Sequence, residues 1–85
     1  MDYVGAKTLL EKAIYSAEEN FGASHLTTAG VYSNWGMVYF NLKELKQAVT
    51  LLEKAYKVYK NHLGEAHPNT KTIKGNLDYV RSQMQ

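Results

Sequence analysis

The chain has 85 residues, of which 45% are hydrophobic and 21% charged, and its formal net charge is +2. This composition fits one small folded domain rich in helix and excludes a disordered tail. The absence of cysteine excludes a disulfide framework and every cysteine-based mechanism. The amino terminus lacks the pattern of a signal peptide, and the uncharged run 20–42 is too polar to span a bilayer, so we expect a cytoplasmic protein.

The first helix is predicted from about residue 2 to residue 20, with Asp2 as its N-cap. Gly22 follows its end, the position where helices most often place a glycine. The apolar residues that share one face of this helix are Tyr3, Ala6, Leu10, Ala13 and Ala17.

The second helix, predicted over about 24–41 with Ser24 as a candidate N-cap, is the one around which the chain is organised. It contains no Lys, Arg, Asp or Glu, and its large apolar residues are spread too broadly for a single stripe. We therefore expect neighbouring helices to enclose it on most sides. A glycine inside a helix costs about 1 kcal/mol relative to alanine, so Gly36 indicates that another helix approaches closely there.

A third helix is predicted over about 44–62 and a fourth over about 68–83. Gly64 ends the third helix, and Pro68 suits the first position of the fourth, where the N–H that proline lacks has no intrahelical partner. The residues expected on the buried face of the third helix are Leu45, Ala48, Leu52, Ala55 and Tyr59. No strand is predicted.

The sequence repeats itself after 42 residues. The run Leu-Leu-Glu-Lys-Ala occurs at 9–13 and again at 51–55. Other equivalent pairs are Gly22 and Gly64, His25 and His67, Thr28 and Thr70, and Asn34 and Asn76. A fixed period of about 20–50 residues is typical of stacked repeats, in which each unit buries its apolar face against its neighbours. We therefore expect one all-α domain over residues 1–85, built from four antiparallel helices.

The two middle helices resemble the tetratricopeptide repeat. The resemblance is carried by a large apolar residue followed by glycine, then tyrosine, then spaced small and large residues, here Trp35, Gly36, Tyr39, Ala48, Leu52 and Ala55. The 42-residue period and the junction 63–68 resemble the longer variant found in kinesin light chains and nephrocystin-type proteins. The resemblance implies that these six residues pack the repeat, and that the helical hairpins form a short α-solenoid of roughly two repeats.

The fourth helix departs from this pattern, because Asp78 and Arg81 stand where Gly36 and Tyr39 stand in the second. It is therefore less suited to receive a further close-packed helix and is expected to act as a cap. Since about three repeats are usually needed for a stable stack, we expect a fragment, an oligomer or a module completed by its partner. The apolar end faces expected to mediate self-association lie around Tyr3, Tyr15, Tyr56 and Val80.

A candidate peptide-binding strip runs along the second and fourth helices, and its members are Asn34, Met37, Phe40, Asn76 and Tyr79. In tetratricopeptide proteins the first helix of each pair lines a concave groove, so the resemblance implies that Asn34 and Asn76 hydrogen-bond the backbone of an extended peptide. A side-chain amide suits this role because it both donates and accepts hydrogen bonds. The alternative is that the two asparagines cap or bridge adjacent helices. Because Gly30, Ser33 and Met37 replace basic residues, no carboxylate clamp is expected.

Other kinds of site are weakly supported. The three histidines, His25, His62 and His67, lack the helical spacing of metal ligands and are expected to close helix ends or to pack between repeats. No catalytic motif appears, and the lysines between 43 and 60 alternate with acids, which is typical of a solvated face and not of a nucleic-acid site.

The sequence therefore predicts a non-catalytic protein-interaction module or scaffold that binds a peptide or helix, without cofactor, metal, nucleic acid or membrane. A structural or self-associating end segment of a longer solenoid is the alternative. The weakest of the three hypotheses is a regulatory appendage of an enzyme.

Overall fold

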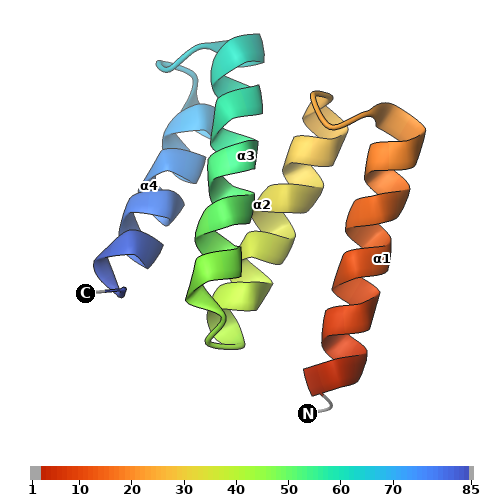
Figure 1. Cartoon of the computed structure of the whole chain (residues 1–85). Helices are drawn as coiled ribbons and strands as arrows, with labels where there is room; N and C mark the ends of the chain where they lie inside the picture. Colours follow the sequence, from red (N-terminus) through yellow and green to blue (C-terminus); the bar gives the residue numbers. More distant parts are fainter. Residues whose placement is uncertain (1–2, 85) are drawn as a thin grey trace.

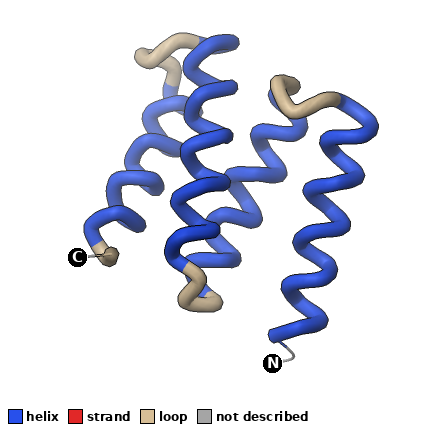
Figure 2. Tube along the Cα trace, viewed as in Figure 1, coloured by secondary structure: helices blue, strands red, loops and turns tan. Residues whose placement is uncertain are grey.

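The computed structural model describes residues 3–84, and of residues 3, 4 and 6 only the backbone. Four helices occupy this range: α1 (Tyr3–Phe21), α2 (Leu26–Asn41), α3 (Leu45–Leu63) and α4 (Pro68–Ser82), and no strand occurs within it. Consecutive helices run antiparallel (Figures 1 and 2). The predicted all-α fold of helical hairpins is thus confirmed. The expected N-cap Asp2 and the side chains of Tyr3 and Ala6 lie outside the described part.

The helices form two layers around α2. Helices α1 and α3 lie in one layer and α2 and α4 in the other (Figure 1). The central helix α2 packs against all three others, most extensively against α3, whereas no Cα atom of α1 lies within 8 Å of one of α3 in the described part of the chain. The Cα atoms occupy a slab of 38 × 35 × 15 Å.

The contact between α2 and α3 depends on a glycine. A Cβ atom on Gly36 would lie 3.0 Å from Cγ of Leu52 and 3.4 Å from the carbonyl oxygen of Ala48. These two residues and Ala55 are fully buried. The close approach predicted from Gly36 is therefore present, and dense packing along α3 offsets the conformational cost of a glycine inside a helix.

Equivalent residues close the helix ends in both copies of the repeat. Gly22 and Gly64 have φ angles of +88° and +86°, a conformation that residues with a Cβ rarely adopt. Helix α2 is capped by His25, whose Nδ1 accepts a hydrogen bond from the backbone N–H of Thr27 at 3.0 Å, and His67 caps α4 in the same way. The expectation that Ser24 caps the second helix is therefore wrong, because an imidazole nitrogen provides the acceptor.

A buried threonine links each hairpin to the next in both copies. The hydroxyl of Thr28 donates to the carbonyl oxygen of Ala17 at 3.2 Å, and the hydroxyl of Thr70 donates to that of Tyr59 at 3.4 Å. Both threonines are fully buried, so these bonds satisfy hydroxyls that water cannot reach.

Some burial differs from the prediction. Val80, expected on an exposed end face, is fully buried with Ile73 and Leu77 on the inner face of α4. In α3 Leu45 and Tyr59 are only half-buried, whereas Leu51 and Val58, expected to widen its apolar arc, are buried. The buried arc of α3 is broad because this helix lies between α2 and α4.

Candidate functional site

The candidate strip lies on neighbouring helices, with Asn34, Met37 and Phe40 on α2 and Asn76 and Tyr79 on α4. The rings of Phe40 and Tyr79 meet edge to face, with centroids 5.5 Å apart and an interplanar angle of 60°. Met37 and Phe40 are half-buried against the core, whereas Tyr79 is 54% exposed. The structure thus brings Phe40 and Tyr79 together across the two helices and leaves part of this aromatic pair open to a ligand.

The amides of the strip are accessible. Asn34 is exposed and Asn76 half-buried, and neither side chain has a hydrogen-bond partner within residues 3–84. No buried side-chain nitrogen or oxygen in that range lacks a partner, so both amides reach solvent. The alternative that these asparagines cap or bridge helices therefore has no hydrogen bond in its support.

The six residues expected to pack the repeat lie at the α2–α3 contact. Tyr39 is 4% exposed, and Gly36, Ala48, Leu52 and Ala55 are buried, while Trp35 is half-buried at the edge of the core. Four fully or nearly fully buried apolar side chains in a chain of this size contribute a large share of the apolar area that stabilises the fold.

The three histidines hold the helix junctions. His25 and His67 cap helices, and Nε2 of His62 lies 2.8 Å from the carbonyl oxygen of Ser24, which ties the end of α3 to the loop between α1 and α2. No three side chains of His, Asp or Glu converge in the part of the chain that the structure describes. Each imidazole thus has a hydrogen bond that fixes a helix end.

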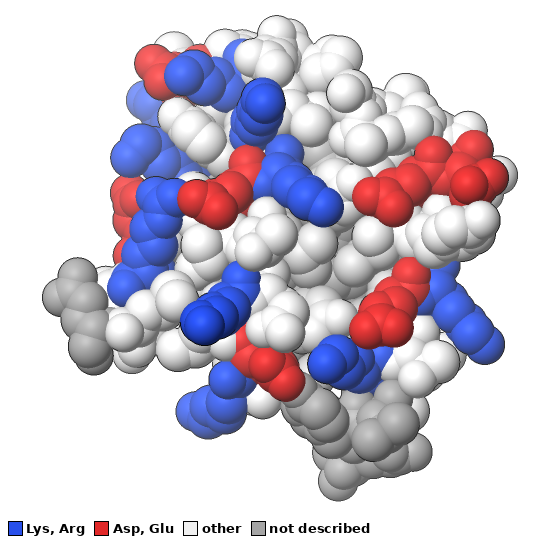
Figure 3. All heavy atoms as spheres, in the orientation of Figure 1, with Lys and Arg blue, Asp and Glu red and all other residues white. Residues whose placement is uncertain are grey.

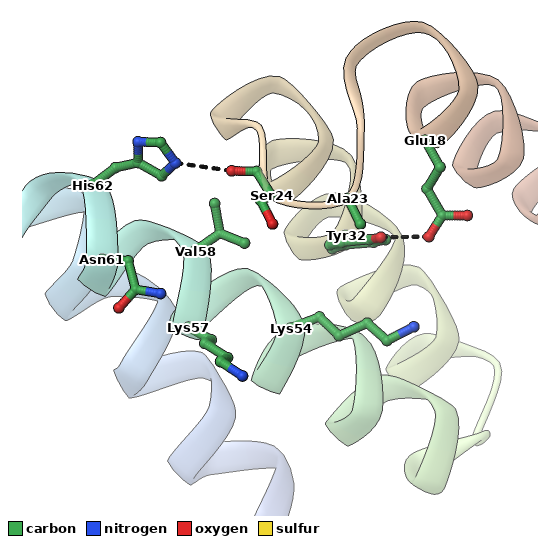
Figure 4. A pocket seen from close by; sticks show the side chains of 9 residues that line it. All are labelled: Glu18, Ala23, Ser24, Tyr32, Lys54, Lys57, Val58, Asn61 and His62. Atoms are coloured by element: carbon green, nitrogen blue, oxygen red, sulfur yellow. Dashed lines mark hydrogen bonds between the residues drawn. The ribbon is translucent and has the colours of Figure 1, made fainter.

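A cavity that the sequence analysis missed lies between α1 and α3, on the layer opposite to the strip. Its volume is about 260 Å³, and Figure 4 labels the nine side chains that line it. Tyr32 from α2 lies at its base and donates its hydroxyl proton to the Glu18 carboxylate, as the dashed line shows. The signal for Tyr32 was its place on the face of α2 that also carries Ala29, Gly36 and Tyr39.

Burial perturbs the two tyrosines of this face. Desolvation, with a smaller contribution from the hydrogen bond to Glu18, raises the pKa of Tyr32 to about 12. Burial also raises the pKa of Tyr39, with a further contribution from the negative charge of Glu11. Both phenols are therefore neutral at physiological pH.

Comparison with known proteins identifies the middle of the chain. Residues 28–69 match the family model described as Tetratricopeptide repeat. This segment is similar to a tetratricopeptide repeat. It covers one 42-residue period, since Thr28 and Thr70 are equivalent positions, and it runs from the third residue of α2 through α3 to the second residue of α4. A search of curated proteins found no match to the chain.

The repeat contributes most of the residues described above. Proteins with tetratricopeptide repeats generally use them as non-catalytic modules for protein interaction. The match covers the α2 part of the strip, which is Asn34, Met37 and Phe40, whereas Asn76 and Tyr79 lie beyond it. It also covers Lys54 and Lys57, the two lysines that line the cavity. None of the helices within residues 3–84 has the length and apolar character needed to cross a membrane.

Charge is distributed unevenly around the repeat. Residues 1–42 carry a formal charge of −2 and residues 43–85 a charge of +4. On the face seen in Figure 3, acidic side chains gather at the upper end of α1, whereas basic and acidic side chains are mixed over the rest of α1 and over α3. Three ion pairs occur among the described residues, Lys60–Glu65 at 3.3 Å, Lys74–Asp78 at 3.1 Å and Arg81–Glu53, and all are exposed.

Proposed function

We propose that the chain is a non-catalytic interaction module that binds a peptide segment or a helix of a partner protein on the strip formed by Asn34, Met37, Phe40, Asn76 and Tyr79. The observation that carries the proposal is the match of residues 28–69 to the tetratricopeptide repeat, whose members bind other proteins. We also propose that the repeat is of the longer variant found in kinesin light chains and nephrocystin-type proteins.

The chemistry of the strip supports this function. Two accessible amides can each donate to and accept from a peptide backbone, which gives affinity without selecting particular side chains. The Phe40–Tyr79 pair and Met37 provide an apolar contact, and aromatic and methionine side chains are enriched where proteins bind one another. The α2 part of the strip has no charged residue, so we expect a partner segment with little net charge.

The test is a selection of displayed random peptides on the wild-type protein, followed by affinity measurements on the enriched peptides. Asn34→Ala combined with Asn76→Ala should weaken their binding at least about tenfold, because two hydrogen bonds are lost, while thermal unfolding changes little. Asn20→Ala is the matched control, since this asparagine is exposed near the end of α1, away from the strip on α2 and α4. If the double variant loses as much stability as binding, the asparagines are structural and the proposal is wrong.

A second candidate function is that of a self-associating end segment. The observation in its favour is Leu9, which is 68% exposed on α1, whereas the equivalent Leu51 on α3 is 8% exposed. Tyr15, also on α1, is 64% exposed. Light scattering over a concentration series tests this candidate: a mass that rises with concentration, and that Leu9→Glu returns to the monomer value, would support it, and a constant monomer mass would exclude it.

A further inference from the structure

The surface between α1 and α3 has the shape of a trough. Both helices pack on α2 but not on each other, so α2 forms the floor of the space between them. Two cavities lie along this space. The first, of about 260 Å³, has Tyr32 at its base, and the second, of about 320 Å³, has Tyr39 at its base. The two cavities thus lie along about two turns of α2, from Tyr32 to Tyr39. The trough is in the layer opposite to the proposed peptide strip.

The first cavity carries more positive than negative charge. Lys54 and Lys57 line it, and neither takes part in the ion pairs of residues 3–84. The ammonium group of Lys54 lies 5.5 Å from the centre of the Tyr32 ring. The single carboxylate of this cavity, that of Glu18, accepts the hydrogen bond of Tyr32. Two lysines and one carboxylate give the cavity a formal net charge of +1, which favours an acidic group of a ligand.

The second cavity is mostly apolar. Ile14 from α1, Tyr39 from α2 and Leu51 from α3 line it, and the side chains of Lys46, Gln47 and Thr50 complete its lining. A Leu, Ile or Met side chain of a ligand would bury its methylene and methyl groups there, and removing these groups from water favours binding.

The spacing of the two cavities specifies the ligand further. Tyr32 and Tyr39 are seven residues apart on α2, which corresponds to about 10 Å along the helix axis. A polyproline II segment has three residues per turn and rises about 3.1 Å per residue, so its side chains at positions i and i+3 point to the same side about 9 Å apart. Such segments keep their backbone solvated, so only their side chains would enter the two cavities, whose tyrosine rings are almost fully buried.

We propose that the α1–α3 trough is a second recognition site, which binds a partner peptide in polyproline II conformation. An acidic side chain of that peptide lies between Lys54 and Lys57, and a large apolar side chain three residues away fills the cavity over Tyr39. Charge complementarity selects the acidic residue, and the distance between the cavities selects the spacing. This site is independent of the strip on α2 and α4.

The probe is the blocked tetrapeptide acetyl-Asp-Pro-Pro-Leu-amide, titrated into the ¹⁵N-labelled protein and followed by NMR chemical shifts. We expect saturable shifts along the facing sides of α1 and α3. The Asn-Pro-Pro-Leu peptide should bind about threefold to tenfold more weakly, the range expected for exposed ion pairs, and Asp-Pro-Pro-Ser should lose the shifts around the second cavity. The shortened Asp-Pro-Leu peptide should not fill both cavities.

Lys54→Gln combined with Lys57→Gln should weaken the first peptide about threefold to tenfold and abolish its advantage over the Asn peptide. Lys71→Gln combined with Lys74→Gln removes the same charge from α4 and should leave the ratio of the two affinities unchanged. Circular dichroism of each variant establishes that the helices are intact. The inference is overturned if the peptides bind equally, if the α3 variant retains the preference, or if the shifts lie on the α2–α4 strip, a result that would favour the proposed function and exclude this second site.

Discussion

Helices α1 and α3 carry the same run, Leu-Leu-Glu-Lys-Ala, but have different environments. Helix α3 lies between α2 and α4, and its Leu51 is 8% exposed. Helix α1 contacts α2 alone, and its equivalent Leu9 is 68% exposed. The second leucine of each run, Leu10 in α1 and Leu52 in α3, is buried in both helices. The shared run therefore keeps its second leucine buried in both helices, while the burial of its first leucine depends on how many helices pack beside it.

The largest expected effect tests this difference directly. Leu51→Ala should lower the free energy of unfolding by about 2–4 kcal/mol, because it removes buried methyl groups and leaves a cavity. Leu9→Ala, the same change at the equivalent position, should alter it by less than about 0.5 kcal/mol. Chemical denaturation of both variants measures these two changes in the free energy of unfolding. Equal losses would mean that α1 is covered in solution, as it would be in a self-associated form.

The next effect concerns the close contact that encloses α3. Gly36→Ala should lower the free energy of unfolding by about 1–2 kcal/mol, because the new Cβ would lie 3.0 Å from Cγ of Leu52. Gly75→Ala in α4 is the control, since no atom lies within 4 Å of its Cβ position. This variant should gain about 0.5–1 kcal/mol from helix propensity. A stabilising Gly36→Ala would show that α2 and α3 can separate slightly without loss.

Loss of the histidine N-cap should lower the free energy of unfolding equally in both copies of the repeat. His25→Ala and His67→Ala each remove the acceptor that caps a helix, at 3.0 Å in α2 and 3.1 Å in α4. We expect each to lower the free energy of unfolding by about 1 kcal/mol, the usual magnitude for an N-cap. Thermal unfolding of the two variants measures this. A much larger loss for one of them would show that its histidine also supports tertiary packing.

The smallest effect at neutral pH is expected from Tyr32→Phe, and it changes in alkali. Because folding raises the pKa of Tyr32 from 10.0 to about 12, folding favours the neutral phenol. Its contribution is fully present below pH 10, and it is lost as the pH rises from 10 to 12. Wild type should therefore lose stability faster than Tyr32→Phe across this window, and the difference between their unfolding free energies should narrow. Denaturant unfolding at several alkaline pH values measures the slope, and parallel slopes would contradict the raised pKa.

Local signals in the sequence predicted most of the fold. Gly22 and Gly64 indicated the ends of the first and third helices, and both residues have positive φ angles there. Gly36 indicated a close helix contact, because a glycine in a helix is costly unless another residue fills the space. Ser24 misled the prediction of the second N-cap, since the better-known capping hydroxyl stands one residue before the imidazole that provides the acceptor.

The trough could not be predicted in this way, because its walls come from helices that are adjacent in space but not in sequence. Lys54 and Lys57 have the helical spacing of an ordinary exposed face, and that interpretation was the reasonable one. Val80 was expected on an exposed end face, but it is fully buried on the inner face of α4, and only the packing of the helices decides this. The strip was inferred from a resemblance, and only the structure brings the rings of Phe40 and Tyr79 together.

The sequence by itself determined the helices, their ends and the 42-residue repeat, because these depend on propensities, caps and periodicity within a few turns of chain. Tertiary structure decided which copy of each repeated residue is buried. Burial depends on the number of helices that cover a face, and α1 and α3 differ in that number although their sequences agree. It also decided where unpaired charge and apolar cavities meet, which is the basis of the proposed second site.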